Sequence, residues 1–285
     1  MTGVKDLLVV VDDSAACATR LDVAVHVAGR FGAHLTGLFV APPPNVPALT
    51  GSEFPASLRA ASDNMEAQRQ AWRRAALAAQ DLFRSRTNMA GITTEWRERE
   101  GDVADITSLH ARYEDLVIVG QMESAPRAGH SGRGLPERLL LGVGRPILVV
   151  PYAGVFKTVG DRVLVAWNAS REATRAVSDA LPILQQASHV TVLAINPRGG
   201  VSGDGDVPGA DLALHLSRHG VNAEASWIKA EDIDVAVMLL SRACDLQADL
   251  IVMGGYGHSR VREIVLGGAT REILRTMTVP TLLSH

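Results

Sequence analysis

The sequence "EDLVIVG", residues 114–120, returns as "ADLIVMG", residues 248–254, at an offset of 134. The segment "RPILVVP", residues 145–151, returns at the same offset as "VPTLLSH", residues 279–285. Equal offsets for two separate segments indicate an internal repeat, in which one structural unit occurs twice along the chain. The sequence therefore predicts two tandem copies of one domain.

The openings of the two copies also match. "DLLVVVDDS" aligns with "DRVLVAWNAS" when Asp12 is set against Asn168, which is an offset of 156. The difference between 156 and 134 leaves 22 extra residues in the first copy, and we expect them in the proline-rich loop 41–55 and in a longer helix after it. We place the two domains at residues 1–154 and 155–285.

Short apolar runs rich in β-branched residues alternate with amphipathic segments in both copies, which is typical of βαβ units and a parallel sheet. Fully apolar strands such as "LLVVV" indicate a sheet that helices cover on both faces. We therefore expect an α/β fold with two tandem, doubly wound, five-stranded parallel sheets. The expected strands are residues 7–11, 35–40, 93–97, 116–119, 147–150, 163–166, 190–195, 223–228, 250–253 and 281–283.

The composition is that of a globular protein: 285 residues, of which 47% are hydrophobic, suffice for real cores. A net charge of -3 with scattered basic residues gives no reason to expect nucleic acid or an anionic membrane as a partner. No secretory signal or membrane span is recognisable, so we expect a cytoplasmic protein. Cys17 and Cys244 are predicted to be reduced thiols in the core.

The stretch "GGYGHSRVREIVLGG", residues 254–268, follows the fourth strand of the second copy. Its glycines allow the backbone to approach a ligand closely, and the N–H groups at the start of a following helix attract anions. A phosphate site and a plain strand-loop-helix turn both fit this pattern. A Walker loop is excluded because no Lys followed by Ser or Thr ends the stretch. A dinucleotide fingerprint is excluded because the turns after the first strands contain no glycine.

With these features the whole chain resembles a tandem universal stress protein. The nucleotide motif of that family is Gly, two residues, Gly, nine residues, Gly, then Ser or Thr, and Gly254, Gly257 and Gly267 match it. The resemblance implies an adenine-nucleotide alpha-hydrolase-like, Rossmann-like fold. It also implies that the last strands, residues 147–150 and 281–283, pair to give an intramolecular pseudo-dimer; a further homodimer is left open.

The resemblance implies that the second domain binds ATP, with AMP or ADP as alternatives and Mg²⁺ left open. The end of the first strand would contact the adenosine, the end of the second would line the adenine, and the glycine loop would wrap the ribose and phosphates. Two residues depart from the family pattern: Asn168 replaces an Asp, and Gly268 replaces a hydroxyl residue. The implied site residues are Ala166, Trp167, Asn168, Ile195, Met253, Gly254, Gly257, His258, Gly267, Gly268, Ala269 and Thr270.

The first copy differs at the same motif. At the offset of 134, Glu123 stands in place of Gly257 and Arg133 in place of Gly267, although Asp12 is kept. An acidic side chain facing phosphates is unfavourable, since like charges repel. We therefore expect a degenerate, empty nucleotide site in the first domain.

Several residues have a structural explanation beside the functional one. Asp12 and Asn168 each follow a strand and precede a helix, so helix capping explains them as readily as ligand contact. Trp167 is expected to pack at the cleft more than to stack on a ligand. His215 and His219 share a helix face without a third ligand, which favours a solvated face over a metal site.

These observations predict a stress-response protein that acts through nucleotide-dependent conformation or partner binding. We predict no catalytic residue, because no nucleophile stands in a context that marks catalysis. One alternative is a nucleotide-free structural or adaptor protein. Another is a slow ATP hydrolase, so enzymatic activity is left open with a binding role favoured.

Overall fold

The computed structural model describes residues 3–43, 54–121, 134–197, 207–229, 232–256 and 268–285. The strands are β1 (Asp6–Val11), β2 (His34–Ala41), β3 (Thr94–Glu100), β4 (Leu116–Gly120), β5 (Ile147–Val150), β6 (Arg162–Trp167), β7 (His189–Ile195), β8 (Ala223–Ile228), β9 (Leu250–Gly254) and β10 (Thr281–Ser284). The helices are α1 (Cys17–Phe31), α2 (Phe54–Thr87), α3 (Val103–Ala111), α4 (Leu135–Gly142), α5 (Arg171–Leu184), α6 (Ala210–Arg218), α7 (Val235–Asp245) and α8 (Gly268–Thr276). All ten predicted strands are confirmed.

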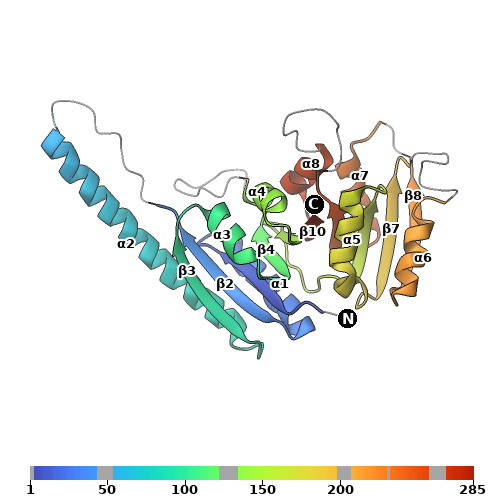
Figure 1. Ribbon diagram of the computed structural model, residues 1–285, viewed down its shortest axis with the longest axis horizontal. Helices are drawn as coiled ribbons and strands as arrows, with labels where there is room; N and C mark the ends of the chain where they lie inside the picture. Colours follow the sequence, from blue (N-terminus) through green and yellow to red (C-terminus); the bar gives the residue numbers. More distant parts are fainter. Residues whose placement is uncertain (1–2, 44–53, 122–133, 198–206, 230–231, 257–267) are drawn as a thin grey trace.

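The strands form one continuous sheet in the order β3-β2-β1-β4-β5-β10-β9-β6-β7-β8 (Figure 1). Each copy contributes five adjacent strands that are parallel to one another. The two halves meet where β5 pairs antiparallel with β10, with Leu148 opposite Leu282. The predicted doubly wound α/β fold is confirmed, and so is the pairing of the last strands, which joins the two expected sheets into one.

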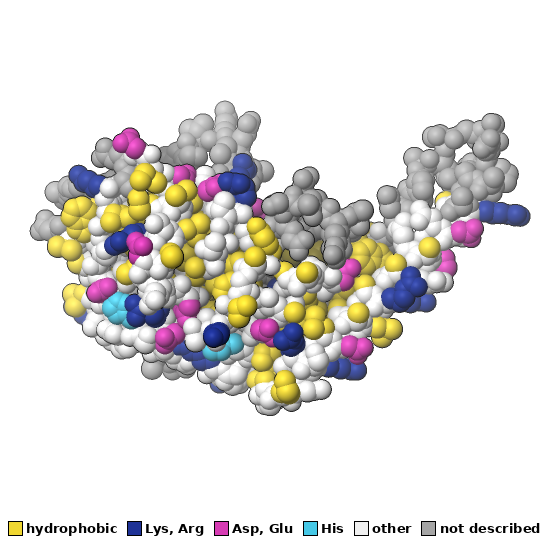
Figure 2. All heavy atoms as spheres, turned by 180° about the vertical axis from the view of Figure 1, so that it is seen from behind, with side chains coloured by type: hydrophobic (Ala, Val, Ile, Leu, Met, Phe, Trp, Pro, Cys, Tyr) yellow, Lys and Arg dark blue, Asp and Glu magenta, His cyan; other side chains and the backbone are white. Residues whose placement is uncertain are grey.

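Burial follows the position of each strand in this sheet. The central strands β5 and β10 are buried along their whole length, because helices cover both faces. The edge strand β3, "TEWRERE", carries alternating charges and is mostly exposed. Charges on an edge strand discourage pairing with another chain. On the face drawn in Figure 2, side chains of both charges are interspersed, in keeping with the small net charge.

The helices form two layers, one on each face of the sheet. One apolar core contains residues of α1, α2, α5 and α6, and the other contains residues of α3, α4, α7 and α8. Both cores run through both copies: Leu148 and Leu282 lie in the first, and Ile147 and Leu283 in the second. The two copies therefore share their hydrophobic cores.

Polar contacts also tie the two copies together. Arg30 of α1 donates hydrogen bonds to the carbonyl oxygens of Val159 and Gln186, at 2.8 and 2.6 Å. Gln121, directly after β4, donates through Nε2 to the carbonyl oxygen of Arg275 in α8 at 3.0 Å. Its Oε1 accepts from the backbone N–H of Tyr152 at 3.2 Å. These bonds fix α1 and α8 of opposite copies relative to the junction.

The extra residues of the first copy lengthen one helix. α2 has 34 residues, whereas α6, at the same place in the second copy, has nine. At 1.5 Å per residue α2 is about 50 Å long, and it extends past the carboxyl ends of β2 and β3 (Figure 1). The longer helix is as predicted, and most of the predicted loop, residues 44–53, lies outside the described residues.

Both cysteines are free thiols. Cys17 is buried in α1 as predicted, but Cys244 is exposed on α7, so its prediction as a core residue was wrong. Among the helices that the structure describes, none is both long and apolar enough to cross a bilayer.

The junction makes a direct prediction. Leu282 is 1% exposed and faces Leu148 across the antiparallel pair, so Leu282→Ala should leave a cavity in the shared core. We expect the substitution to lower the free energy of unfolding by about 2–5 kcal/mol, measured by chemical denaturation. The control Leu77→Ala, on α2 and 63% exposed, should change it by less than about 0.5 kcal/mol. Equal losses for the two variants would contradict a packed junction.

Candidate functional site

The winding of the second half reverses between β6 and β9. β7 and β8 follow on one side of β6, whereas β9 and β10 lie on the other. In doubly wound sheets, ligands bind beyond the carboxyl ends of the strands at such a reversal. A pocket of about 280 Å³ opens at this place, close to the lower end of the range for small-molecule sites.

The structure brings the predicted site residues together around this pocket. Gly257, His258 and Gly267 lie outside the described residues. The other nine predicted residues all line the pocket: Ala166, Trp167, Asn168, Ile195, Met253, Gly254, Gly268, Ala269 and Thr270. Sequence reasoning missed five further lining residues: Leu193, Val235, Ala236, Leu239 and Ile273.

The ends of three adjacent strands form the base of the pocket. Ala166 of β6 lies opposite Met253 of β9 on one side and Leu193 of β7 on the other. Because Ala166 carries only a methyl group, it leaves space between its two larger neighbours. Ile195 lies two residues beyond Leu193, on the same face of β7.

Helix α7 supplies an apolar wall. The carboxylate of Asp234 accepts a hydrogen bond from the backbone N–H of Ala236 at 2.7 Å, which caps the start of the helix. Ala236 and Leu239 are buried, and Val235 is partly exposed at the mouth. The sequence alone did not single out these positions.

Helix α8 supplies the polar side. Gly268, Ala269 and Thr270 form the first described turn of the helix, and the N–H groups at a helix start have no acceptor within the helix. The partial positive charge at a helix start favours an anion. The Thr270 hydroxyl oxygen accepts from the backbone N–H of Tyr256 at 3.3 Å, which holds the beginning of the glycine stretch against this turn.

Helix capping, one of the two explanations for Asp12 and Asn168, does not describe Asn168, and no side chain caps α1. Helix α5 is capped by Ser170, whose Oγ accepts from the backbone N–H of Ala173 at 3.1 Å. Asn168 instead accepts from the backbone N–H of Ser170 at 3.2 Å, and Asp12 accepts in the same way from that of Ser14 at 3.0 Å. Both side chains therefore form Asx turns, in which the side-chain oxygen of Asn or Asp accepts from the backbone N–H two residues later.

The structure also shows the positions of Trp167, His215 and His219. Trp167 is half-buried, lines the pocket, and packs against the apolar core on the α5 face, as its packing interpretation predicts. The rings of His215 in α6 and His219, directly after this helix, lie 4.6 Å apart. Within the described part of the chain, no group of three metal-ligating side chains is present.

The first copy has a buried charge pair at the corresponding place. Arg20 of α1 is 4% exposed, and its Nη2 lies 2.7 Å from Oδ2 of Asp12. Gly120 at the end of β4 leaves room for the guanidinium, because a side chain there would collide with it. Burial alone would raise the pKa of Asp12, but Arg20 and the hydrogen bonds from Ser14 outweigh it and hold the pKa below its usual range.

The two copies carry different residues at two aligned positions near the carboxyl ends of their strands. By the same alignment, Arg20 corresponds to the buried Ala176 of α5, and Val10 corresponds to Ala166. Val10 is 4% exposed and packs into the core, whereas Ala166 lines the pocket. Sequence reasoning missed Arg20, although a charged residue within the apolar stripe of α1 was the available signal.

Comparison with known proteins identifies the class. A model of the universal stress protein family (Usp) matches residues 3–143 and 160–285 of this chain. The chain therefore belongs to the universal stress protein family, with two copies of its domain in tandem. The universal stress protein Slr1230 from Synechocystis is 29% identical over 175 residues, which span 59% of this chain and 57% of the relative, less than two thirds of its length.

Solved structures share the fold over nearly the whole chain. A universal stress protein from Archaeoglobus fulgidus DSM 4304 superposes with a TM-score of 0.67 at 19% identity, covering 98% of this chain and 97% of its own. The functionally unknown protein PA1789 from Pseudomonas aeruginosa PAO1 does so with a TM-score of 0.56 at 15% identity, covering 99% and 92%. At these identities the likeness concerns the fold alone.

The charge pair of the first copy predicts unequal effects of its two partners. Asp12→Asn leaves the buried Arg20 guanidinium without its carboxylate, which should lower the free energy of unfolding by about 3 kcal/mol. Arg20→Met leaves Asp12, whose side chain is 33% exposed, and water can solvate it there. We therefore expect the loss for Arg20→Met to be clearly smaller. Denaturation in urea at pH 7 measures both, and a larger loss for Arg20→Met would contradict this assignment.

The same pair predicts a pH dependence. Because folding lowers the pKa of Asp12, its contribution to stability is present above the unfolded pKa of about 3.9 and is lost as the pH falls through the folded value. The difference in stability between the wild type and Asp12→Asn should be constant near neutrality and shrink below about pH 4. A difference that grows on acidification would show that the carboxylate is not the stabilising form.

Proposed function

We propose that this chain binds one adenine nucleotide, ATP or its products AMP or ADP, in the pocket of its second copy. We further propose that it responds through conformation or partner choice. The observation that carries the proposal is the polarity of the pocket. Apolar side chains of β7 and α7, the first described residues of α8 and Gly254 all line the same pocket. A molecule with a flat apolar ring at one end and an anion at the other suits this arrangement.

The apolar side suits a purine. Leu193, Ile195 and Leu239 offer aliphatic surface against which a ring can be buried. Asn168 lies beside them, and its amide can both accept and donate hydrogen bonds, as ribose hydroxyls require. The missing carboxylate at this position is thus replaced by a neutral group with a wider range of partners.

The polar side suits phosphate. Backbone N–H groups at a helix start bind anions without any charged side chain. The Thr270 hydroxyl oxygen accepts from the backbone N–H of Tyr256, and the same hydroxyl can also act as a donor, for which a phosphate oxygen is a suitable acceptor. This proton can take over the role of the hydroxyl that Gly268 lacks.

We propose that the first copy, residues 1–154, holds no nucleotide, while the second, residues 155–285, holds one. Both carboxylate oxygens of Asp12 are engaged within the chain, Oδ1 by Ser14 and Oδ2 by Arg20. Val10 adds two methyl groups where the second copy has Ala166. These differences support a single site for each chain.

The contacts around α8 suggest how nucleotide binding in the second copy would change the conformation of the first. The start of α8 borders the pocket, and the carbonyl oxygen of Arg275 in the same helix accepts from Gln121 of the first copy. Gly255, next to the pocket, leaves room for the side chain of Leu140 in α4. A ligand that orders α8 and the backbone around Gly255 would therefore bias elements of both copies.

Two substitutions at Gly268 test the phosphate side. Among the described residues, no atom lies within 4 Å of a Cβ built at Gly268, so we expect a side chain to be tolerated there. Gly268→Glu places a carboxylate where we expect an anion, and ATP affinity measured by calorimetric titration should fall roughly tenfold or more. Gly268→Ser restores a hydroxyl donor, and the affinity should rise roughly three- to tenfold.

Thermal unfolding provides the control for these variants. A Glu in the first turn of a helix favours the helix, so Gly268→Glu should unfold at a temperature no lower than that of the wild type. If the folded Gly268→Glu protein binds ATP with unchanged affinity, the phosphates do not bind at the start of α8. Absence of ATP, ADP and AMP binding to the wild type would favour a nucleotide-free adaptor instead.

A further inference from the structure

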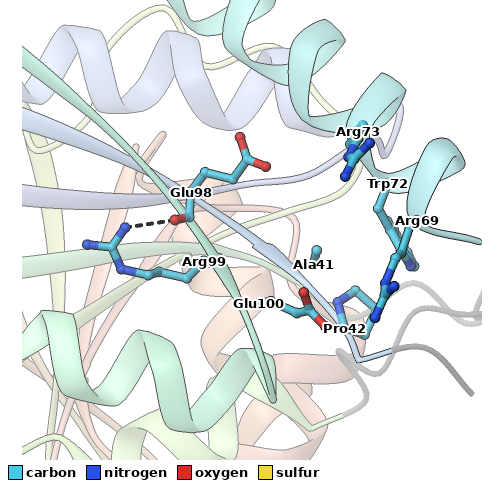
Figure 3. Close-up of a pocket in the computed structure, with 8 residues that line it drawn as sticks. All are labelled: Ala41, Pro42, Arg69, Trp72, Arg73, Glu98, Arg99 and Glu100. Carbon is cyan, nitrogen blue, oxygen red and sulfur yellow. Dashed lines mark hydrogen bonds between the residues drawn. The ribbon is translucent and has the colours of Figure 1, made fainter.

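A second cleft, of about 380 Å³, lies at the carboxyl ends of β2 and β3, where α2 passes them (Figure 3). α2 packs into the same core as α1, so the cleft lies on the face of the sheet opposite to the pocket of the second copy. It depends on the length of α2, and the corresponding helix α6 has only nine residues. The cleft is therefore separate from the proposed nucleotide site.

Two walls of opposite charge line the cleft. Arg69 and Arg73 lie one turn apart on α2, with Trp72 between them in sequence (Figure 3). On the other wall, Glu98 and Glu100 are two residues apart on β3, and alternate residues of a strand share a face. Ala41 and Pro42, at the end of β2, add apolar surface, and Arg99 of β3 also belongs to the lining.

The register of β3 explains why its carboxylates face α2. Trp96 lies two residues before Glu98 and packs against Phe83 of α2, with ring centroids 5.6 Å apart. Glu98 and Glu100 continue the same face of the strand. Arg99 projects to the other side, where its Nη1 donates to the carbonyl oxygen of Glu98 at 2.7 Å (Figure 3).

The four charged side chains of the two walls remain available. Within the described part of the chain, Arg69, Arg73, Glu98 and Glu100 form no side-chain hydrogen bond or ion pair. Arg97, on the other face of β3, instead pairs with two carboxylates of its own. The cleft therefore keeps two cations and two anions without partners on facing walls.

We infer that this cleft binds a small zwitterion of the amino-acid class, with its carboxylate at Arg69 and Arg73 and its ammonium at Glu98 and Glu100. A simple anion would be attracted by one wall and repelled by the other, and the same holds for a simple cation. Only a molecule that carries both charges gains from both walls. Trp72 and Pro42 add apolar surface, which favours an amino acid with a large apolar side chain.

Three probes of similar shape test the charge requirement. L-phenylalanine carries both charges, 3-phenylpropanoate lacks the ammonium group, and 2-phenylethylamine lacks the carboxylate. In equilibrium dialysis at low salt, L-phenylalanine should bind saturably, and each single ion should bind roughly tenfold or more weakly. Equal or tighter binding of 3-phenylpropanoate would make the cleft an anion site and overturn the proposal.

Paired variants test the two walls. Arg69→Gln with Arg73→Gln, and separately Glu98→Gln with Glu100→Gln, should each weaken L-phenylalanine binding roughly tenfold or more. The matched control is Arg74→Gln, because Arg74 is an exposed neighbour on α2 that does not line the cleft. Binding that survives both double variants, or is lost in the control, would overturn the assignment, as would no saturable binding of L-phenylalanine to the wild type. ATP affinity should be unchanged in all these variants.

Discussion

The antiparallel pairing of β5 with β10 is the constraint on which the rest of the structure depends. Each of these four-residue strands is fully buried, and in an isolated copy each would form the edge of a sheet. Such an edge exposes unpaired N–H and C=O groups together with apolar side chains, which is an aggregation hazard. By pairing with each other the two strands remove both edges and join the cores. The edges that remain, β3 and β8, are more exposed and more polar.

The shared core leaves the two copies free to differ at their strand ends. In the first copy, Arg20 and Asp12 form a charge pair next to the carboxyl end of β1, and Val10 is buried in the core. In the second, Ala166 and Ala176 occupy the matching positions, and a pocket opens beside Ala166. A buried pair is a costly way to stabilise a fold, but removing one partner costs more, so such a pair tends to persist once present. The additional length of α2 gives the first copy a cleft at the carboxyl ends of β2 and β3.

Much of this architecture could be predicted from the sequence. Matching segments at repeated offsets located six strands, among them the central ones, because a strand covered on both faces is apolar almost throughout. The alternation of short strand-like runs with amphipathic segments located the other four, including the polar edge strands β3 and β8. The glycine spacing and the strand ends led to nine residues that line one pocket, since the carboxyl ends of parallel strands meet at one edge. Other features needed coordinates. A helical period can mark Ala236 and Leu239 as buried, but it does not show that they line a pocket. Similarly, the sequence does not show how far α2 extends beyond the ends of β2 and β3, because that depends on where the chain turns. The position of Arg20 in the apolar stripe of α1 was a signal that it is buried, but the sequence does not show that its partner is Asp12.

We propose that the second copy binds a nucleotide and that the first copy does not. The most direct test is the number of nucleotides bound by each chain, obtained from calorimetric titration of the full-length protein with ATP at protein concentrations well above the dissociation constant. We predict one nucleotide per chain. Two per chain would show that the charge pair of Arg20 and Asp12 does not exclude nucleotide from the first copy, and would contradict the asymmetry on which this account rests.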